Sequence, residues 1–207
     1  MPIVLGLDLS QTRTGWAVLD TVNPASFGHL EYPAWGNDEP KWLSEFHGWL
    51  VHLIYTHKVT HVFYEESFIP PPRKTMGKRG KMISKPAESF ANRFAQLALI
   101  AITQVSAYEN MCEVNVVRIK DWRDRFIGTH ISPPSYGPGD ASRRWFKDQA
   151  KTAANLLGWY TADDNEAEAL GIAHYGMCCI NKRYTENTHV HTARMQKRFE
   201  EMMRGER

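Results

Sequence analysis

The sequence predicts a single α/β domain in which a mixed β-sheet is flanked by helices. The first observation is the length of 207 residues, which suits one well-buried domain better than two. The second is the hydrophobic share of 43%, which is typical of a folded chain. The third is the order of the expected elements, β-β-β-α-β-α-β-α-α, because strands that come to alternate with helices predict a sheet covered by helices.

The strands are predicted from apolar and β-branched runs. Residues 3–8 and 14–20 bracket the polar turn Ser-Gln-Thr-Arg-Thr and read as a hairpin. Residues 29–34 are expected to add a third strand. Residues 60–66 and 113–119 combine β-branched, aromatic and alternating residues, so they predict two more.

The helices are predicted from apolar residues at helical spacing. The expected helices cover residues 40–57, 87–108, 120–126, 142–157 and 164–180.

Two segments are expected to lie outside this regular framework. Residues 131–142 are crowded with Pro and Gly and predict a loop. Residues 181–207 predict a basic C-terminal helical tail with Met195, Phe199 and Met202 on one face. One folded domain would then cover residues 1–180.

The chain shows no sign of export or membrane insertion. No run approaches the roughly 18 apolar residues of a membrane span, and the first residues lack a basic start followed by a long apolar core. The three cysteines, Cys112, Cys178 and Cys179, have no spacing typical of disulfides or zinc. These features favour a cytoplasmic protein.

Positive charge is concentrated in one loop. The net charge is +2, yet residues 67–87 hold six Lys and Arg and no acid, so the rest of the chain sums to −4. A basic loop on a slightly acidic body indicates an anionic polymer as partner. The alternative is an ordinary solvated loop.

Acidic residues stand where apolar elements end. Asp8 ends the first strand, and Glu65 and Glu66 end the strand of residues 60–66. Glu168 lies inside the apolar run of the helix 164–180, one turn after Asp164. Burying an unpaired carboxylate costs several kcal/mol, so three such segments favour one shared divalent-ion site with oxygen ligands.

Each acid also has a simpler interpretation. Asp8 could accept hydrogen bonds from the turn that follows it. Strand alternation turns one of Glu65 and Glu66 to solvent, and Glu65 would face the same way as Phe63. Asp163 and Glu166 form a capping-box pattern that needs no function. Glu168 is not explained in this way, so convergence remains the favoured interpretation.

Three motifs carry a resemblance to a known family. The segment "GLDLSQTRTGWAVL" resembles the first motif of RuvC-type Holliday junction resolvases, and "VFYEESF" resembles the second. The segment "DDNEAEALGIA" resembles the last motif in the form seen in phage-encoded members, and "AKTAANLLGWY" before it is similar to the same proteins. The matches span roughly residues 3 to 176.

The resemblance implies a ribonuclease H-like fold and a Mg²⁺-dependent endonuclease that resolves Holliday junctions or other branched DNA. By position, Asp8, Glu65 and Glu168 would be catalytic metal ligands. Family members usually have an Asp or His where this chain has Asn165, so Asp164 or the Asn165 amide would be the fourth ligand. A basic residue on the preceding helix would be Lys151 or Lys147.

The mechanism implied is phosphodiester hydrolysis with two ions about 3.5–4 Å apart, Mn²⁺ being able to replace Mg²⁺. Asp8 would bridge the ions, and Lys151 would offset charge on the phosphate. Basic and aromatic side chains of the loop would track phosphates and stack on a base. The residues expected to bind DNA are Phe68, Arg73, Lys74, Lys78, Arg79 and Lys81.

The resemblance also implies a homodimer, because symmetric junctions need two active sites, in the cytoplasm of a bacterial or infected bacterial cell. The apolar faces of helices 87–108 and 142–157 are candidate interfaces. Two other functions stay open: a catalytically weakened branched-DNA-binding protein, suggested by Asn165, and an actin-like kinase. The chain is short for two kinase lobes.

Overall fold

The sheet has five strands in the order β3-β2-β1-β4-β7. A computed structural model of the chain describes residues 1–32, 39–66, 73–76, 82–85 and 90–204. β1 is antiparallel to β2, β2 is antiparallel to β3, and β4 and β7 continue the sheet parallel to β1. The strands are β1 (Val4–Asp8), β2 (Arg13–Leu19), β3 (Ser26–Glu31), β4 (His61–Glu65) and β7 (Glu113–Val117). This is the mixed sheet that the sequence predicts.

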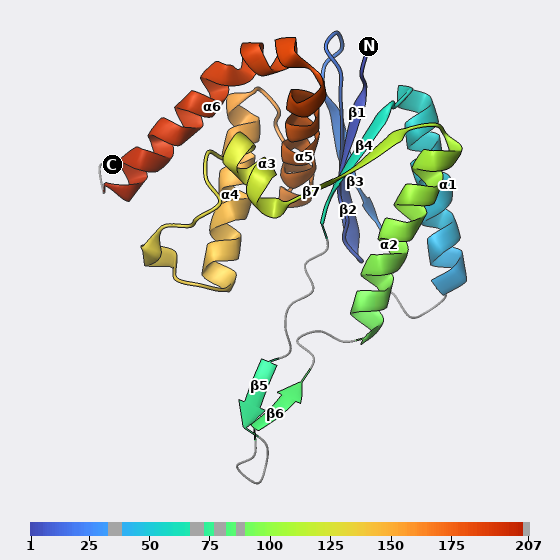
Figure 1. Cartoon of the computed structure of the whole chain (residues 1–207), viewed down its shortest axis with the longest axis horizontal. Coiled ribbons are helices and arrows are strands. Elements are labelled where there is room, and N and C mark those ends of the chain that lie inside the picture. Colours follow the sequence, from blue (N-terminus) through green and yellow to red (C-terminus); the bar gives the residue numbers. More distant parts are fainter. Residues whose placement is uncertain (33–38, 67–72, 77–81, 86–89, 205–207) are drawn as a thin grey trace.

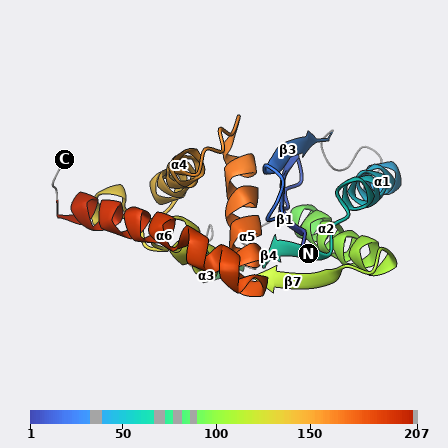
Figure 2. The ribbon, with the colours of Figure 1, turned by 90° about the horizontal axis from the view of Figure 1, so that it is seen from above.

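Helices cover both faces of the sheet. Figures 1 and 2 show α1 and α2 on one side and α3, α4, α5 and α6 on the other. A short 3₁₀ turn, η1, precedes α4 in the predicted loop. The bounds are α1 Glu39–His57, α2 Phe90–Glu109, α3 Ile119–Phe126, η1 Pro134–Tyr136, α4 Asp140–Leu156, α5 Asp164–Ile180 and α6 Lys182–Met203.

Strand alternation divides the core into two layers. Leu5 and Leu7 of β1 pack with buried residues of α1 and α2. Val4 of β1 and Phe63 of β4 face the other way and pack with α3, α4 and α5. Successive side chains of a strand point to opposite faces, so Gly6 and Asp8 lie on the α5 side with Val4.

Helix α5 lies very close to β1 and β2 because both strands carry glycine beneath it. A Cβ on Gly6 would lie 2.5 Å from the carbonyl oxygen of Ala169, and a Cβ on Gly15 would lie 2.1 Å from that of Asn165. Neither position can take a side chain without moving the helix. The small residues of α5 predict such a close approach, and the structure confirms it.

Two element boundaries differ from the prediction. The strand predicted over 113–119 ends at Val117, and α3 begins at Ile119, because Trp122 and Phe126, four residues apart, are fully buried on one helix face. The strand predicted over 29–34 begins earlier, at Ser26, because Ser26 pairs with Val18 of β2. Residues 33 and 34 lie outside the described part of the chain.

The basic loop contains secondary structure that the sequence does not predict. β5 (Arg73–Met76) and β6 (Met82–Lys85) pair antiparallel, with Arg73 opposite Lys85 and Met76 opposite Met82. Figure 1 shows this hairpin away from the five-stranded sheet. An irregular loop was therefore the wrong expectation for these eight residues.

The C-terminal segment forms the helix α6 over Lys182–Met203, and part of it docks on the domain. Met195 of α6 is buried in the layer that contains α3, α4 and α5. Gly128 has a φ of +90°, and a Cβ there would lie 2.9 Å from the backbone nitrogen of Gln196, so α6 lies directly on the segment after α3. The side chains of Phe199 and Met202 are outside the described part. Among the helices that the structure describes, none is both long and apolar enough to cross a membrane.

Candidate metal centre

Two of the expected ligands leave the sheet side by side. β1 and β4 are parallel, with Leu7 opposite Tyr64, so Asp8 and Glu65 are the next residues at the same carboxyl edge. Tyr64 packs in the α1 and α2 layer, whereas Glu65 accepts a hydrogen bond from the indole of Trp122 on α3, at 2.7 Å. Glu65 therefore faces the same side as Phe63.

The third carboxylate reaches this edge from α5. Glu168 lies one turn after Asp164 on α5, and Asn165 at the start of the helix packs on Gly15, the residue paired with Asp8. All three carboxylates line one pocket of ≈ 950 Å³. The other lining residues are Leu9, Ser10, Gln11, Thr12, Arg13, Glu31, Tyr32, Glu66, Asn92, Gln96, Ile119, Arg123, Arg143, Lys147, Asp164 and Asn165.

Burial raises the pKa of all three carboxylates, and neighbouring acids add to the shifts of Asp8 and Glu168. Burial, and then the charges of Glu168 and Glu65, raise the pKa of Asp8 well above its ordinary value. Burial and the charge of Glu65 raise the pKa of Glu168 to about 7, although Arg123 and Lys147 oppose this shift. Burial also raises the pKa of Glu65, against the hydrogen bond from Trp122 and the charge of Arg123. Charge neutralisation at this site, by protons or by cations, is therefore favourable.

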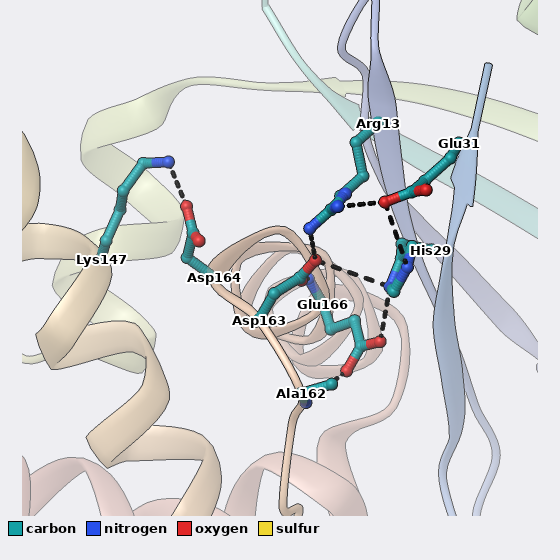
Figure 3. Close-up of polar contacts among 8 residues, drawn as sticks. All are labelled: Arg13, His29, Glu31, Lys147, Ala162, Asp163, Asp164 and Glu166. Atoms are coloured by element: carbon teal, nitrogen blue, oxygen red, sulfur yellow. Dashed lines mark hydrogen bonds and ion pairs between the residues drawn. The ribbon is translucent and has the colours of Figure 1, made fainter. Parts of the chain in front are cut away.

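Positive side chains close the pocket on the α3 and α4 side. Lys147 of α4 donates a hydrogen bond to Asp164 (Figure 3). Burial alone would raise the pKa of Asp164, but the contact with Lys147 lowers it. Arg123 of α3 lies 3.7 Å from Glu168, and its guanidinium stacks 4.2 Å from the centre of the Phe146 ring.

The two candidate lysines occupy different positions. Lys147 lines the pocket, whereas Lys151, one helical turn later on α4, is not among the described residues that do so. Lys151 contributes only a weaker charge effect on Asp164. Of the two basic residues that the resemblance offers, Lys147 is thus the one whose amino group reaches an acid of the site.

The residues expected to contact DNA fall mostly outside the described chain. Arg73 and Lys74 belong to β5. Phe68, Lys78, Arg79 and Lys81 lie outside the described residues.

Sequence reasoning missed the α3 contribution to the site. Trp122 and Arg123 belong to the short helix predicted over residues 120–126, to which no role in the site was assigned. The indole of Trp122 bonds Glu65, and Arg123 faces Glu168. The available signal was a tryptophan followed by arginine in "KDWRDRF" shortly after a strand. Arg143, at the start of α4, also lines the pocket without having been predicted.

A second polar cluster lies at the start of α5, outside the pocket floor. Asp163 is the N-cap and accepts a hydrogen bond from the Glu166 amide, at 2.9 Å. Glu166 reaches back to the amide of Ala162 rather than that of Asp163, so the predicted capping box is present in a modified form. Glu166 also contacts His29 of β3, which the capping pattern does not explain (Figure 3).

The pocket residues fit a hard divalent cation. Asp8, Glu65 and Glu168 supply carboxylate oxygens, which Mg²⁺ prefers. Burial, and then the charge of neighbouring carboxylates, raises the pKa of Asp8 and that of Glu168, and a cation would offset both effects. Their oxygens are spread around the pocket.

A different set of residues forms a compact group of possible metal ligands. In the described part of the chain, ligand atoms of His29, Asp163 and Glu166 all lie within 4.8 Å of one another.

This sheet, with acids at the ends of two parallel strands and a third on the helix across them, has the ribonuclease H-like fold. No protein-family model matches the sequence. No curated protein matches it either. Solved structures do match, and they have the fold of RuvC-type Holliday junction resolvases.

Three of these solved structures set the scale of the similarity. RuvC of Thermus thermophilus in complex with a Holliday junction substrate superposes with a TM-score of 0.59 at 13% identity, covering 87% of this chain and 97% of that one. T. thermophilus RuvC in another structure gives 0.59 at 14%, covering 86% and 96%. The yeast mitochondrial Holliday junction resolvase Ydc2 gives 0.51 at 10%, covering 95% and 84%. At these identities the similarity is one of fold, and the phage-encoded branch stays a prediction.

Metal-free protein is expected to lose stability as the pH rises from 5 to 8. The pKa of Glu168 is about 7 in the folded chain against an ordinary value of 4.5, so between these values the folded state holds a proton that the unfolded state has released. Raising the pH removes that proton and destabilises the fold by about 3 kcal/mol. Thermal unfolding in a chelator at several pH values measures this effect.

Two variants make the measurement specific. Glu168→Gln cannot titrate, so its stability should fall much less over the same range, whereas Glu45→Gln on an exposed turn of α1 should behave like the parent. An equal loss in Glu168→Gln and the parent would show that Glu168 is not the group responsible.

Proposed function

We propose that this protein is a metal-dependent, structure-selective endonuclease that resolves Holliday junctions or related branched DNA by phosphodiester hydrolysis. The observation that carries the proposal is the meeting of Asp8, Glu65 and Glu168, from β1, β4 and α5, in one pocket with raised pKa values for all three. The solved T. thermophilus RuvC complex with a Holliday junction supports the choice of substrate.

The pocket carboxylates would hold Mg²⁺, or Mn²⁺ in its place. Asp8, Glu65 and Glu168 are the proposed ligands, with Asp164 or the amide oxygen of Asn165 as a further one, since both line the pocket. Two bound ions would supply a water activated for attack and charge neutralisation at the leaving 3′ oxygen.

The chain's own cations would position the phosphate. Arg123, Arg143 and Lys147 line the side of the pocket opposite the strand ends, where they offset the negative charge of DNA entering an acidic site. Trp122 holds the Glu65 carboxylate through its indole N–H, so Glu65 keeps one orientation. Lys147 is paired with Asp164, and this pair would rearrange when phosphate enters.

Asp8→Asn is expected to abolish cleavage and keep junction binding. The amide keeps the shape of the carboxylate but lacks its charge, so the ions lose a ligand while the basic surfaces that hold DNA are unchanged. Cleavage of a labelled four-way junction with Mg²⁺, and binding of the same junction in Ca²⁺, measure the two effects. Asp148→Asn, an exposed acid on α4, is the matched control.

Undiminished cleavage by Asp8→Asn would refute the assignment of Asp8. The same assay tests the second candidate function, a catalytically weakened protein that binds branched DNA. This candidate is considered because Asn165 stands where the family usually has Asp or His. If the parent binds junctions tightly but shows no cleavage with Mg²⁺ or Mn²⁺, the binding function is correct and the nuclease is not.

Lys147→Ala is expected to lower the cleavage rate more than Lys151→Ala does. Lys147 lines the pocket and reaches Asp164, whereas Lys151 stands one turn away. A single positioned charge-assisted contact in a catalytic site is worth about 10²–10³ in rate, so we expect a loss of that order for Lys147→Ala. Single-turnover kinetics measure the cleavage rate. A larger loss of rate for Lys151→Ala than for Lys147→Ala would show that Lys151, not Lys147, is the basic residue of the site.

The basic loop is proposed to bind the phosphates of the junction arms. Neutralising Arg73, Lys74, Lys78 and Arg79 together should flatten the dependence of log K on log salt by up to about 3–4 units, because each phosphate contact contributes about 0.9 to the slope. Fluorescence anisotropy between low and moderate salt measures it. The matched control neutralises four surface residues of α6 and should keep the slope of the parent; these are Lys182, Arg183, Lys197 and Arg198. Equal slopes in the parent and the loop variant would show that the loop does not contact the phosphates.

The protein is proposed to act as a homodimer through the outer face of α2. Leu97, Val105 and Tyr108 share that face at helical spacing and are 48%, 51% and 83% exposed. The apolar face of α4, the other candidate, is already buried in the core through Trp145 and Phe146.

Replacing Leu97 and Val105 by Glu should convert a dimer into a monomer in sedimentation velocity, because two charges would enter the apolar contact. Tyr55→Glu on α1, 79% exposed, should leave the dimer intact. A parent that is monomeric at micromolar concentration would contradict the proposal.

A further inference from the structure

A histidine and two carboxylates converge beside the proposed nuclease pocket. His29 of β3 faces Asp163 and Glu166 at the start of α5, and the three offered ligand atoms lie within 4.8 Å of one another. Figure 3 shows Asp163 pointing toward this group while the adjacent Asp164 points the other way, toward Lys147. His29, Asp163 and Glu166 are not among the residues that line the pocket, although their neighbours Arg13 and Glu31 are.

The separations within the cluster match those between ligands of one metal ion. The Nδ1 atom of His29 lies 2.9 Å from Oε1 of Glu166 and 3.5 Å from Oδ2 of Asp163. Zinc binds His nitrogen and carboxylate oxygen at about 2.0–2.2 Å, so neighbouring ligand atoms in a tetrahedral site lie about 3.3–3.6 Å apart. The His29–Asp163 separation already falls in this range, and the His29 and Glu166 atoms would move apart by about 0.5 Å to admit an ion.

The charge of the cluster also favours a divalent cation. Asp163, Glu166 and Glu31 contribute three negative charges, and Arg13, which pairs with both Asp163 and Glu31, contributes one positive charge. With His29 neutral, as a metal ligand must be, the group carries −2. One divalent ion would balance it. The side chains of Asp163 and Glu166 are only 13% and 8% exposed, so solvent screens this charge weakly.

We infer that His29, Asp163 and Glu166 form a second metal site, which binds Zn²⁺ or a similar transition-metal ion independently of the Mg²⁺ pocket. Imidazole together with carboxylates suits Zn²⁺, whereas all-oxygen sites suit Mg²⁺. Water fills the fourth position from the side of His29, which is 30% exposed. Arg13 leaves Asp163 as the ion enters and keeps its contact with Glu31.

The site would fasten the edge of the sheet to the start of α5. His29 comes from β3, and the two carboxylates come from the first turn of α5 and its N-cap. An ion shared between them fixes the helix start relative to the strands. Glu168 lies on the same helix, so the ion stabilises the placement of a pocket residue without touching DNA.

Zinc binding to a variant that lacks two of the three proposed pocket ligands tests this inference without reference to nuclease activity. The full chain carrying Asp8→Asn and Glu168→Gln is loaded with Zn²⁺ in excess Mg²⁺, desalted and measured for bound zinc by mass spectrometry. We expect one zinc ion per chain, with a melting temperature that rises with zinc concentration. Adding His29→Ala should weaken zinc binding at least about tenfold. Loss of a residue that only supports a metal ligand already lowers metal affinity by about tenfold or more, and His29 is proposed as a ligand itself.

His47→Ala is the matched control. His47 of α1 also faces a carboxylate, that of Glu109, at 3.1 Å. Within the described part of the chain, however, His47 does not belong to a group of three possible metal ligands. Zinc binding should therefore persist in His47→Ala. Circular dichroism establishes that each variant is folded, and His29→Gln replaces His29→Ala if the latter is not. Absence of bound zinc in the double variant, or zinc retained unchanged by a folded His29 variant, would overturn the inference.

Discussion

Burial of carboxylates at one edge of the sheet is the constraint on which the rest of this structure depends, and the charges of neighbouring carboxylates add to it. The parallel strands β1 and β4 end side by side, and α5 crosses them at short range, so Asp8, Glu65 and Glu168 line one pocket. Burial, and then the charge of neighbouring carboxylates, raises the pKa of Asp8 and that of Glu168. Neutralisation by protons or by cations relieves this cost, and the proposed divalent ions would do so at neutral pH.

The start of α5 is where this constraint is resolved. Adjacent acids Asp163 and Asp164 point in opposite directions, the first toward Arg13 and the second toward Lys147 (Figure 3). One contact ties the helix to β2 and the other ties it to α4. The helix end is thus held from both sides, and its position decides how far Glu168 lies from the strand ends. Capping alone would fix the local backbone but not this distance.

The sheet and its acids could be predicted from the sequence because the signals are local. An apolar run that ends in a carboxylate, as at Asp8 and Glu65, is visible within a few residues, and strand alternation then gives the face. The partners of these acids could not be predicted in the same way. Lys147 and Lys151 lie one turn apart on the same helix face, and only the packing of α4 against α5 decides which one reaches Asp164. His29 lies on an edge strand whose start was misplaced, because the strand begins with Ser26, which pairs with Val18 but carries no apolar signal. The β5–β6 hairpin was missed because its strands, RKTM and MISK, are only four residues each and mostly polar.

Glycine explains why α3, the least predictable element, can take part in the site. Gly171 of α5 has no side chain, and a Cβ there would lie 2.8 Å from the rings of Trp122 and Phe126. The absence of a side chain lets α3 pack against α5 as closely as α5 packs against β1. Trp122 can then bond Glu65, and Arg123 can face Glu168. Close packing on both sides of one helix, permitted by glycines in β1, β2 and α5, therefore gathers acids and their compensating partners in one place. A larger residue at any of these glycines would separate groups whose electrostatic balance requires contact, even if the helix itself remained intact.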